Sequence, residues 1–342
     1  MLYRAMRPLL FGLDPERAHR LSLASLDTLH RLGLARLALG AAPSLPVHAM
    51  GLDFPNPVGL APGLDKNGEY VDALAALGFG FIEIGAVTPR PQPGHAKPRL
   101  FRLPQAEAII NRMGFNNAGV DRVIENVRRS RYRGILGINI GKNADTPADH
   151  AADDYLVCLR KVYPVASFVT ANVSSPNTPN LRSLQGKDEL DALLRAMMRE
   201  RNDLVQTHGR SVPLAVKIAP DLDDEAIEYI AELLLAHRVD AVIATNTTTS
   251  REGVANLPHG REQGGLSGAP LRAKSTEVVA KLQRALKGRL PIIGVGGIAS
   301  AADAREKLDA GATLVQLYTA LIYRGPELVG DIVRGLAASG RA

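Results

Sequence analysis

The sequence has no tryptophan, one cysteine and few aromatic residues, and each shortage counts against a class of protein. Aromatic side chains make up 4% of the residues, which is few for a protein that binds single-stranded nucleic acid by stacking on its bases. The lone cysteine, Cys158, can form no internal disulfide, so a reducing, cytosolic setting fits the chain best. We expect Cys158 to be a small core residue of a helix over residues 154–162 and not a nucleophile.

Long apolar runs are missing as well. No stretch approaches the roughly 18 uncharged apolar residues of a membrane-spanning helix, and the opening segment lacks the small-residue cleavage site of a signal peptide. The net charge of +6 is partly local, because six arginines minus three acids through Gly40 give that segment +3. A second basic run holds Arg128, Arg129, Arg131 and Arg133. No nucleic-acid-binding motif accompanies these charges, so we predict no nucleic-acid partner.

From Val58 onward, short apolar runs alternate with segments of helical period. The runs are nearly continuous and rich in β-branched residues, as is typical of parallel strands buried on both faces. The eight runs are Val58–Ala61, Phe79–Gly85, Ile135–Ile140, Phe168–Val173, Leu214–Ile218, Ala241–Thr245, Ile292–Val295 and Leu314–Leu317. Helical segments between them include Tyr70–Leu77, Lys187–Thr207, Asp224–His237, Ser275–Leu286 and Ala301–Ala310. Eight strand–helix units predict an α/β fold, a (β/α)8 or TIM barrel, and a doubly wound open sheet is the alternative.

Two further features concern the ends of the predicted barrel. Residues Val47–Phe54, broken at Gly51, predict a hairpin that could close its amino-terminal end. Long insertions follow the second strand, at Arg90–Asn117, and the sixth strand, at Ala255–Gly268. Insertions that follow barrel strands lie on the face where active sites form.

The opening segment differs from the rest and predicts a small helical module, residues 1–40, attached to a barrel domain of residues 41–342. The sequence Asp14-Pro15-Glu16 is a good helix start, with an N-cap, a proline at the first position and an acid in the first turn. In a shorter helix before it, Pro8 should kink or stop the helix. Arginines flank the apolar stripes of both helices, so the module could lie on a membrane surface or pack on the barrel as a cap.

Amide, glycine and lysine residues stand where the predicted strands end. Because those ends meet at one rim, five asparagines there suit a flat, polar, heteroaromatic ligand. Lys217 lies inside a buried strand and needs a partner, which a bound anionic ring would supply. Gly296-Gly297 before a helix, followed one unit later by Tyr318-Thr319, predicts a phosphate site. No His or carboxylate pair falls at these ends, so we expect no bound metal and no hydrolysis by paired carboxylates. The five asparagines are Asn111, Asn139, Asn172, Asn177 and Asn246.

Several of these motifs resemble those of a known family. They are Ala61–Lys66, Ile109–Asn117, Gly137–Asn143, Asn172–Thr178, Ala244–Thr248 and Gly294–Ile298. Jointly they resemble class 2 dihydroorotate dehydrogenases, from the N-terminal helices to about Gly325. The resemblance implies a TIM barrel that holds FMN and oxidises dihydroorotate to orotate in pyrimidine biosynthesis, with a membrane quinone as the final electron acceptor. It also implies a peripheral location on the cytoplasmic side of the cell membrane, with the N-terminal helices on the membrane surface.

The resemblance implies the site residues position by position. In that family a serine at the position of Ser175 is the catalytic base, where class 1 enzymes use cysteine. Ala86 stands where many members have threonine or serine. FMN would be lined by Pro62, Gly63, Leu64, Asp65, Lys66, Ala86, Asn139, Asn172, Lys217, Thr245, Gly268, Gly297, Tyr318 and Thr319. The substrate would be held by Lys66, Asn111, Arg112, Met113, Gly114, Phe115, Asn172, Asn177, Asn246 and Thr247. The quinone path would include His19, Arg102 and Tyr318.

The hypothesis for catalysis is that Ser175 takes the C5 proton of dihydroorotate while a hydride leaves C6 for the flavin. An unaided serine is a poor base, so Thr178 and a water would carry the proton away. Lys217 would stabilise the anionic reduced flavin, and Lys66 would favour negative charge on substrate or flavin. Two other functions stay open. One is a different FMN barrel enzyme, such as a tRNA dihydrouridine synthase or a class 1 enzyme with a soluble acceptor, and the other is a non-catalytic basic barrel that binds nucleic acid or membrane.

Overall fold

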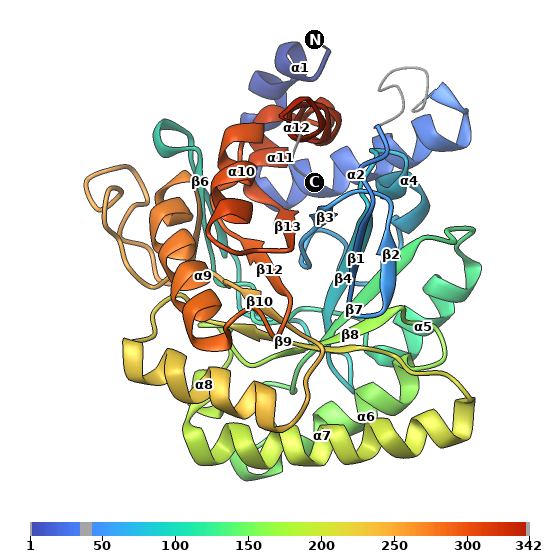
Figure 1. The fold of residues 1–342 in the computed structure, drawn as a ribbon. Coiled ribbons are helices and arrows are strands. Elements are labelled where there is room, and N and C mark those ends of the chain that lie inside the picture. Colours follow the sequence, from blue (N-terminus) through green and yellow to red (C-terminus); the bar gives the residue numbers. More distant parts are fainter. Residues whose placement is uncertain (1, 35–42, 340–342) are drawn as a thin grey trace.

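Eight parallel strands form a closed barrel at the centre of the molecule, and helices surround it (Figure 1). The computed structural model describes residues 2–34 and 43–339, so the domain boundary expected at residue 40 lies outside the described residues. Around the barrel the strands follow the order β10-β12-β13-β3-β4-β7-β8-β9. The predicted TIM barrel is therefore confirmed and the open sheet is excluded. The strands are β3 Val58–Leu60, β4 Phe81–Val87, β7 Ile135–Ile140, β8 Phe168–Asn172, β9 Leu214–Ile218, β10 Ala241–Ala244, β12 Ile292–Val295 and β13 Leu314–Leu317.

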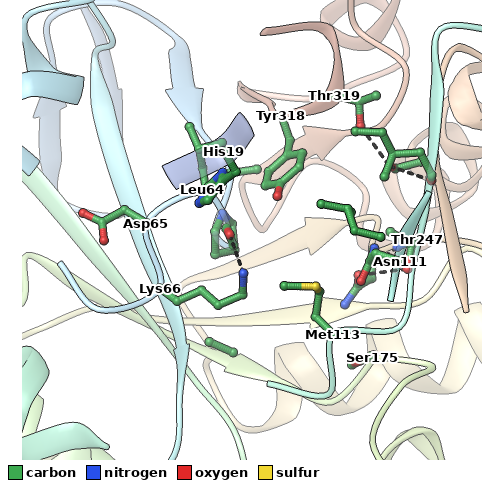
Figure 2. Close-up of a pocket in the computed structure, with 18 of the residues that line it drawn as sticks. His19, Leu64, Asp65, Lys66, Asn111, Met113, Ser175, Thr247, Tyr318 and Thr319 are labelled. Atoms are coloured by element: carbon green, nitrogen blue, oxygen red, sulfur yellow. Dashed lines mark hydrogen bonds between the residues drawn. The ribbon is translucent and has the colours of Figure 1, made fainter. Parts of the chain in front are cut away.

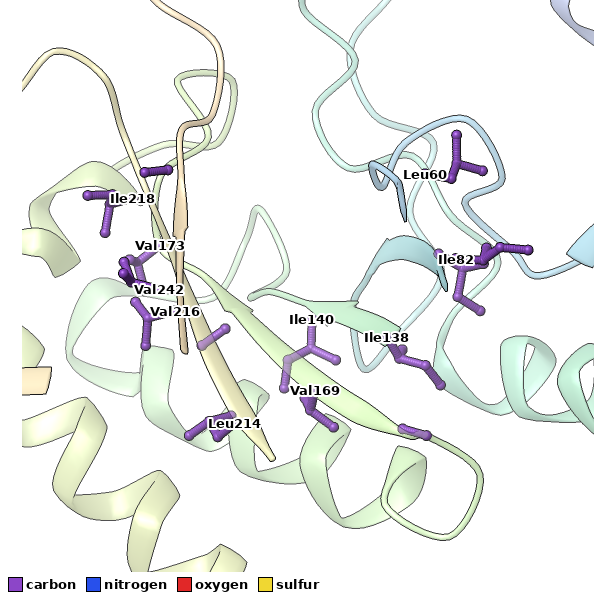
Figure 3. Packing of buried hydrophobic residues seen from close by; sticks show 14 of the residues in the cluster. Leu60, Ile82, Ile138, Ile140, Val169, Val173, Leu214, Val216, Ile218 and Val242 are labelled. Atoms are coloured by element: carbon purple, nitrogen blue, oxygen red, sulfur yellow. The ribbon is translucent and has the colours of Figure 1, made fainter. Parts of the chain in front are cut away.

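The strands form where the apolar runs predicted them. In most of these strands every residue is buried, because one face of the strand lies toward the barrel interior and the other toward the helices. Strands β4, β8 and β9 expose no residue at all, and β-branched side chains pack well on such a surface. Strands β7, β9, β12 and β13 have the predicted bounds. Strands β3, β8 and β10 end one residue early, and β4 begins and ends two residues later than predicted. Outward side chains such as Ile140, Val169 and Val216 belong to the core between strands and helices (Figure 3).

The amino-terminal end of the barrel is closed by an antiparallel hairpin, as predicted. Strands β1 Val47–Ala49 and β2 Leu52–Phe54 pair with each other. Phe54 then packs edge-on against Phe81 inside the barrel, with ring centroids 5.2 Å apart, and Phe81 packs on Phe168 at 6.1 Å. This apolar plug leaves only the carboxyl end of the barrel free to hold a ligand.

The helices of the barrel follow the predicted segments closely. Asp223 caps α8 by accepting a hydrogen bond from the backbone N–H of Ala226 at 2.8 Å, and Ser300 caps α10. Cys158 is fully buried on α6, which confirms its structural role. The helices are α4 Val71–Ala75, α5 Val120–Arg129, α6 Ala151–Val162, α7 Lys187–His208, α8 Asp224–Ala236, α9 Arg272–Leu286, α10 Ala301–Asp309, α11 Thr319–Arg324 and α12 Glu327–Ala338. The short 3-10 helices are η1 Pro104–Ala106, η2 Ala148–His150, η3 Arg182–Gln185 and η4 Ala269–Leu271.

The two long insertions meet in a second sheet, which the sequence did not predict. Strands β5 Leu100–Leu103 and β6 Ala108–Asn111 come from the first insertion, and β11 Gly265–Gly268 comes from the second. They pair antiparallel in the order β11-β6-β5. Asn111 lies at the end of β6, so this sheet carries one of the predicted amides to the rim of the barrel.

In the part of the chain that the structure describes, two named helices precede the barrel, and we call residues 2–34 the N-terminal module. Asp14 starts the second helix as predicted, because it accepts a hydrogen bond from the backbone N–H of Arg17 at 2.9 Å. Pro8 was predicted to kink or stop the first helix, and it does not stop it, since that helix continues to Phe11. A proline removes one backbone hydrogen bond, and the last turn is kept by the bond from the N–H of Gly12 to the carbonyl of Pro8 at 3.1 Å. The helices are α1 Leu2–Phe11 and α2 Pro15–Arg31.

The N-terminal module packs on the barrel and also leaves apolar side chains exposed. Arg99 donates two hydrogen bonds to the carboxylate of Glu16, at 2.8 and 3.1 Å. Arg102 donates to the carbonyls of Leu10 and Phe11, both at 3.1 Å. Among residues 2–34 and 43–339, no helix is long and apolar enough to cross a membrane. The exposed large hydrophobic residues of the described chain all lie in this module, and they are Met6, Leu9, Leu21, Leu29, Leu32 and Leu34.

Candidate active site

A cavity of about 780 Å³ opens at the rim where the barrel strands end, and helix α2 covers part of it. Its lining includes the last residue of β8 and residues that directly follow β3, β10, β12 and β13, as is usual for active sites of this fold. The volume is in the range of cofactor and small-molecule sites. Figure 2 shows Lys66 and His19 on one side of the cavity and Asn111 and Thr247 on the other.

The turn after β3 supplies a lysine whose charge depends on pH. The carboxylate of Asp65 accepts hydrogen bonds from the backbone N–H groups of Glu69 and Tyr70, at 3.0 and 2.7 Å, and so stabilises the turn. The ammonium group of Lys66 donates to the carbonyl of Gly63 at 2.9 Å. Burial lowers the pKa of Lys66 to about 8, although the carboxylate of Glu16 opposes the shift. Lys66 is therefore mostly charged at neutral pH and able to pair with an anion.

The amide side chains at the strand ends form one hydrogen-bonded chain. Asn246 donates to the side-chain oxygen of Asn172 at 3.2 Å, and Asn172 donates to that of Asn139 at 2.9 Å. Asn139 donates in turn to the carboxylate of Glu83 at 2.8 Å. Asn172 and Asn246 line the cavity, and Asn139 lies behind them, fully buried. This series of hydrogen bonds fixes the orientation of each amide and so determines which of its donors and acceptors can bind a ligand.

A second pair of amides joins the inserted sheet to the barrel. Asn177, in the loop after β8, donates to the backbone carbonyl of Asn111 at 3.0 Å and to its side-chain oxygen at 3.2 Å. Both residues line the cavity, and so does Thr247. The insertion is thus held against the loop that carries Ser175.

Ser175 is nearly buried at the cavity wall, with 6% of its surface exposed. Its hydroxyl accepts a hydrogen bond from the backbone N–H of Asn177 at 3.2 Å. Thr178 follows in the same loop but does not line the cavity, and its buried hydroxyl has no hydrogen-bond partner among the described residues. A buried hydroxyl without a partner is costly unless a water or ligand satisfies it. The hydroxyl of Thr178 is therefore a group that a water or ligand could satisfy.

The barrel interior holds a buried lysine and a buried carboxylate, and the sequence reasoning missed the carboxylate, Glu83. Lys217 projects from β9 and is 5% exposed, and burial lowers its pKa while the charge of Glu83 opposes the shift. The carboxylate of Glu83, on β4, accepts hydrogen bonds from Asn139 and from Gln316 on β13. Because β3 separates β4 from β13, the second bond crosses the interior. Glu83 is the single acid in the apolar run Phe81–Val87, and a buried acid in such a run could have indicated a functional or paired carboxylate.

The far end of the cavity is bounded by glycines that have no room for a side chain. Gly297 has φ of 71°, and a Cβ added there would lie 2.4 Å from the Cβ of Arg272. Gly268 has φ of 99°, and a Cβ there would lie 2.3 Å from the carbonyl oxygen of Glu107. Both conformations favour glycine. Thr319 donates to the hydroxyl of Ser267 at 2.8 Å and completes this end of the cavity.

Two arginines expected at the site have their guanidinium groups bound elsewhere. Arg112 does not line the cavity, because it donates to the carboxylate of Glu262 at 2.8 Å and to the carbonyl of Pro98 at 3.0 Å. Arg102 does not line it either, and its guanidinium stacks over the ring of Phe11 at 4.7 Å and ties α1 to β5. The other expected residues line the cavity, except Asn139 and Thr178 as described above.

Comparisons with known proteins identify the family. A family model described as dihydroorotate dehydrogenase matches residues 44–339. The chain belongs to the dihydroorotate dehydrogenase family. A relative from Chromobacterium violaceum named dihydroorotate dehydrogenase (quinone) is 65% identical over 337 residues, which cover 98% of each chain. One of the same name from Nitrosospira multiformis is 62% identical over 98% of this chain and 96% of its own length.

A solved dihydroorotate dehydrogenase has the same fold over nearly the whole chain. The crystal structure of DHODH in complex with ferulenol from Eimeria tenella superposes with a TM-score of 0.87 at 38% identity, covering 97% of this chain and 94% of that one. The family predicted from the strand-end motifs is therefore confirmed, and the alternative of a tRNA dihydrouridine synthase is set aside.

Proposed function

We propose that this chain is a class 2 enzyme that oxidises dihydroorotate to orotate in pyrimidine biosynthesis and passes the electrons to a quinone. The observation that carries the proposal is the cavity at the barrel rim, which brings Ser175, Lys66 and the amides together in a chain 65% identical to a dihydroorotate dehydrogenase (quinone). Amide donors and acceptors beside a charged lysine suit a flat, anionic ring.

Anaerobic addition of dihydroorotate to the purified, flavin-loaded protein tests the proposal. We expect the flavin absorbance to bleach and then to return when a quinone is added. Fumarate and NAD, the soluble acceptors, should restore little of it. A protein whose bound flavin stays oxidised in the presence of dihydroorotate would contradict the proposed reaction.

We propose FMN as the resident cofactor, because the cavity suits it in two respects. The close-packed glycines Gly268 and Gly297 let backbone N–H groups approach a phosphate without side chains in between. The buried side-chain oxygen of Gln316 has no hydrogen-bond partner within residues 2–34 and 43–339, and Gln316 lines the cavity, so this oxygen can accept from a ring N–H. Bound flavin supplies a hydride acceptor. It would be held by Pro62, Gly63, Leu64, Asp65, Lys66, Ala86, Asn172, Lys217, Thr245, Gly268, Gly297, Tyr318 and Thr319, with Asn139 behind Asn172.

The substrate is proposed to lie between Lys66 and the amides of the opposite wall. The ammonium of Lys66 would pair with the substrate carboxylate, and the amides would fix the ring by hydrogen bonds in its plane. Arg112 stays outside this set, because its guanidinium is bound to Glu262. The proposed contacts are Lys66, Asn111, Met113, Gly114, Phe115, Asn172, Asn177, Asn246 and Thr247.

Ser175 is proposed to take the proton from C5 of the substrate. The hydrogen bond from the N–H of Asn177 orients its hydroxyl oxygen. Thr178, whose hydroxyl has no partner, would accept the proton through a water and pass it outward. Lys217, which lines the cavity, would stabilise the negative charge that reduction places on a bound flavin.

The affinity for orotate is expected to fall as the pH rises above about 8. Lys66 has a pKa of about 8, so it loses its charge above that pH, and only the charged form attracts the carboxylate of orotate. Binding is then linked to uptake of one proton, and the Kd should rise by up to about tenfold per pH unit. Titration of the flavin spectrum with orotate across this range measures the slope. The variant Lys66→Met should bind more weakly with little pH dependence, and equal slopes for both proteins would refute the assignment.

The quinone is proposed to reach the flavin beneath the N-terminal module. His19, on α2, and Tyr318, after β13, line the same cavity. Burial, with the nearby charge of Lys66, lowers the pKa of His19 to about 4, so this imidazole is neutral. Burial raises the pKa of Tyr318 to about 12, so it keeps its proton. Two uncharged side chains suit an apolar electron carrier. Arg102 acts on this path only by anchoring α1.

We propose that the N-terminal module, predicted to span residues 1–40, lies on the cytoplasmic surface of the membrane. Leu9 is 77% exposed and Leu32 is 66% exposed, and exposed leucines of this kind gather in the module alone among the described residues. Arg4 and Arg20 stand exposed beside them. An apolar face with flanking arginines is typical of a helix that rests in the interface of anionic lipid.

The double variant Leu9→Glu and Leu21→Glu is expected to lose at least about tenfold in affinity for vesicles that contain anionic phospholipid, because two leucines leave the lipid interface. Cosedimentation with the vesicles measures the loss. Asn202→Glu with Gln206→Glu, on the exposed face of α7, adds the same charge as a control. Bleaching by dihydroorotate should be unchanged in both proteins. Equal loss in the control would mean that net charge, and not the leucines, decides binding.

A further inference from the structure

One arginine outside the cavity joins three of the loops at the barrel rim. Arg182, at the start of η3, donates from Nε to the carbonyl of Ser174 at 3.1 Å. From Nη2 it donates to the carbonyl of Thr247 at 2.8 Å, and from Nη1 to the carboxylate of Asp221 at 3.0 Å. These three partners follow β8, β10 and β9 in turn.

Asp221 extends the same connection to a helix. Its carboxylate accepts hydrogen bonds from the backbone N–H of Thr249 at 2.9 Å and from the ammonium of Lys274, on α9, at 2.6 Å. The hydroxyl of Thr248 donates to it as well. Burial would raise the pKa of Asp221, but the hydrogen bonds from Lys274 and Thr248 outweigh burial and hold the pKa well below its usual range. The carboxylate is therefore ionised at neutral pH.

The two carbonyls that Arg182 binds lie at the proposed site. Ser174 precedes Ser175 in the chain, and Thr247 is itself a proposed substrate contact that lines the cavity. Neither Arg182 nor Asp221 lines the cavity. A guanidinium is planar and always charged, with donors in a fixed fork, so it can hold three acceptors in one geometry where a lysine could not.

We propose that Arg182 and Asp221 are positioning residues, which hold the Ser175 loop at a set distance from the Thr247 loop across the substrate. The inference rests on the proposed function of Ser175. With 24% of the Arg182 side chain and 17% of the Asp221 side chain exposed, the pair is shielded enough from water to keep a defined geometry. Loss of the pair frees both loops to move, and a shift of about 1 Å at the reacting atoms can cost about 100-fold in rate.

The variants Arg182→Gln and Asp221→Asn test the proposal in the flavin-loaded protein. Stopped-flow bleaching by dihydroorotate should slow about 10- to 100-fold, whereas reoxidation of the bleached flavin by quinone should keep its rate. Arg182→Lys keeps the charge but not the fork, so its rate should lie between those of the wild type and Arg182→Gln. Arg201→Gln is the matched control, because it breaks a similarly shielded pair with Asp240 on the far side of the barrel, and it should alter thermal stability without altering either rate.

Hydrogen exchange supplies a readout that does not depend on turnover. In Arg182→Gln, the backbone of residues 173–181 and 246–251 should exchange faster, while the rest of the barrel keeps its protection. Wild-type bleaching rates in both Arg182→Gln and Asp221→Asn, or unchanged exchange in these segments, would overturn the positioning role. If dihydroorotate fails to bleach the wild type, the proposed function fails, and the exchange data still decide whether Arg182 holds the loops.

Discussion

Replacing Ser175 by alanine is expected to slow the reduction of the flavin by dihydroorotate about 10²- to 10⁴-fold, the range that a positioned acid or base contributes. The side chain is nearly buried and its hydroxyl is held by the N–H of Asn177. Alanine removes the proposed proton acceptor and should leave the loop intact. Stopped-flow absorbance of the flavin under anaerobic conditions measures the rate, and flavin content and orotate affinity should change little.

Ser183→Ala is the matched control for this result. Ser183 lies on η3, close to Ser175 in the sequence, with an exposed side chain that donates to the carbonyl of Asn180 at 2.6 Å. It should bleach at the wild-type rate. Thr178→Val removes the proposed proton outlet, and its bleaching rate should lie between those of Ser175→Ala and Ser183→Ala. Near-normal bleaching of Ser175→Ala would remove this serine from the reaction.

Replacing Lys217 by methionine is expected to lower the midpoint potential of the bound flavin and to slow its reduction about 10²- to 10³-fold. Lys217 is the buried cation of the cavity wall, and Glu83 is the charge that acts on it. In a site that excludes water a positive charge stabilises the anion formed on reduction, and methionine keeps the volume while removing the charge. Redox titration with reference dyes measures the potential, and stopped flow measures the rate.

Lys142→Met provides the comparison with another buried lysine. Lys142 is 1% exposed but does not line the cavity, and its ammonium donates to the carbonyls of Asn143 and Thr146, at 3.2 and 2.9 Å. Replacing Lys142 should lower the thermal stability of the protein and should not change the midpoint potential of the flavin. If Lys217→Met shifts stability alone, like Lys142→Met, its electrostatic role at the flavin is wrong.

Much of the site follows from the order of residues along the chain, because a barrel turns sequence order into spatial order. Once the apolar runs are taken as strands, Ser175, Asn172 and Asn246 must gather at one rim. The positions of Arg112 and Arg102 do not follow, because each side chain could turn toward the cavity or away from it. Arg112 binds Glu262, and Arg102 binds the end of α1, and both partners are distant in sequence from the arginine.

The sequence alone determined the eight buried strands, the hairpin that closes one end of the barrel, the helix start at Asp14 and the family of the protein. Each of these features depends on the spacing of residues within short segments of the chain. Only the tertiary structure decided the sheet of β5, β6 and β11, the interior bond from Gln316 to Glu83, and the contacts of Arg182. Each joins residues distant in sequence. In strands buried on both faces, moreover, no alternation of apolar and polar residues marks which side chains point inward.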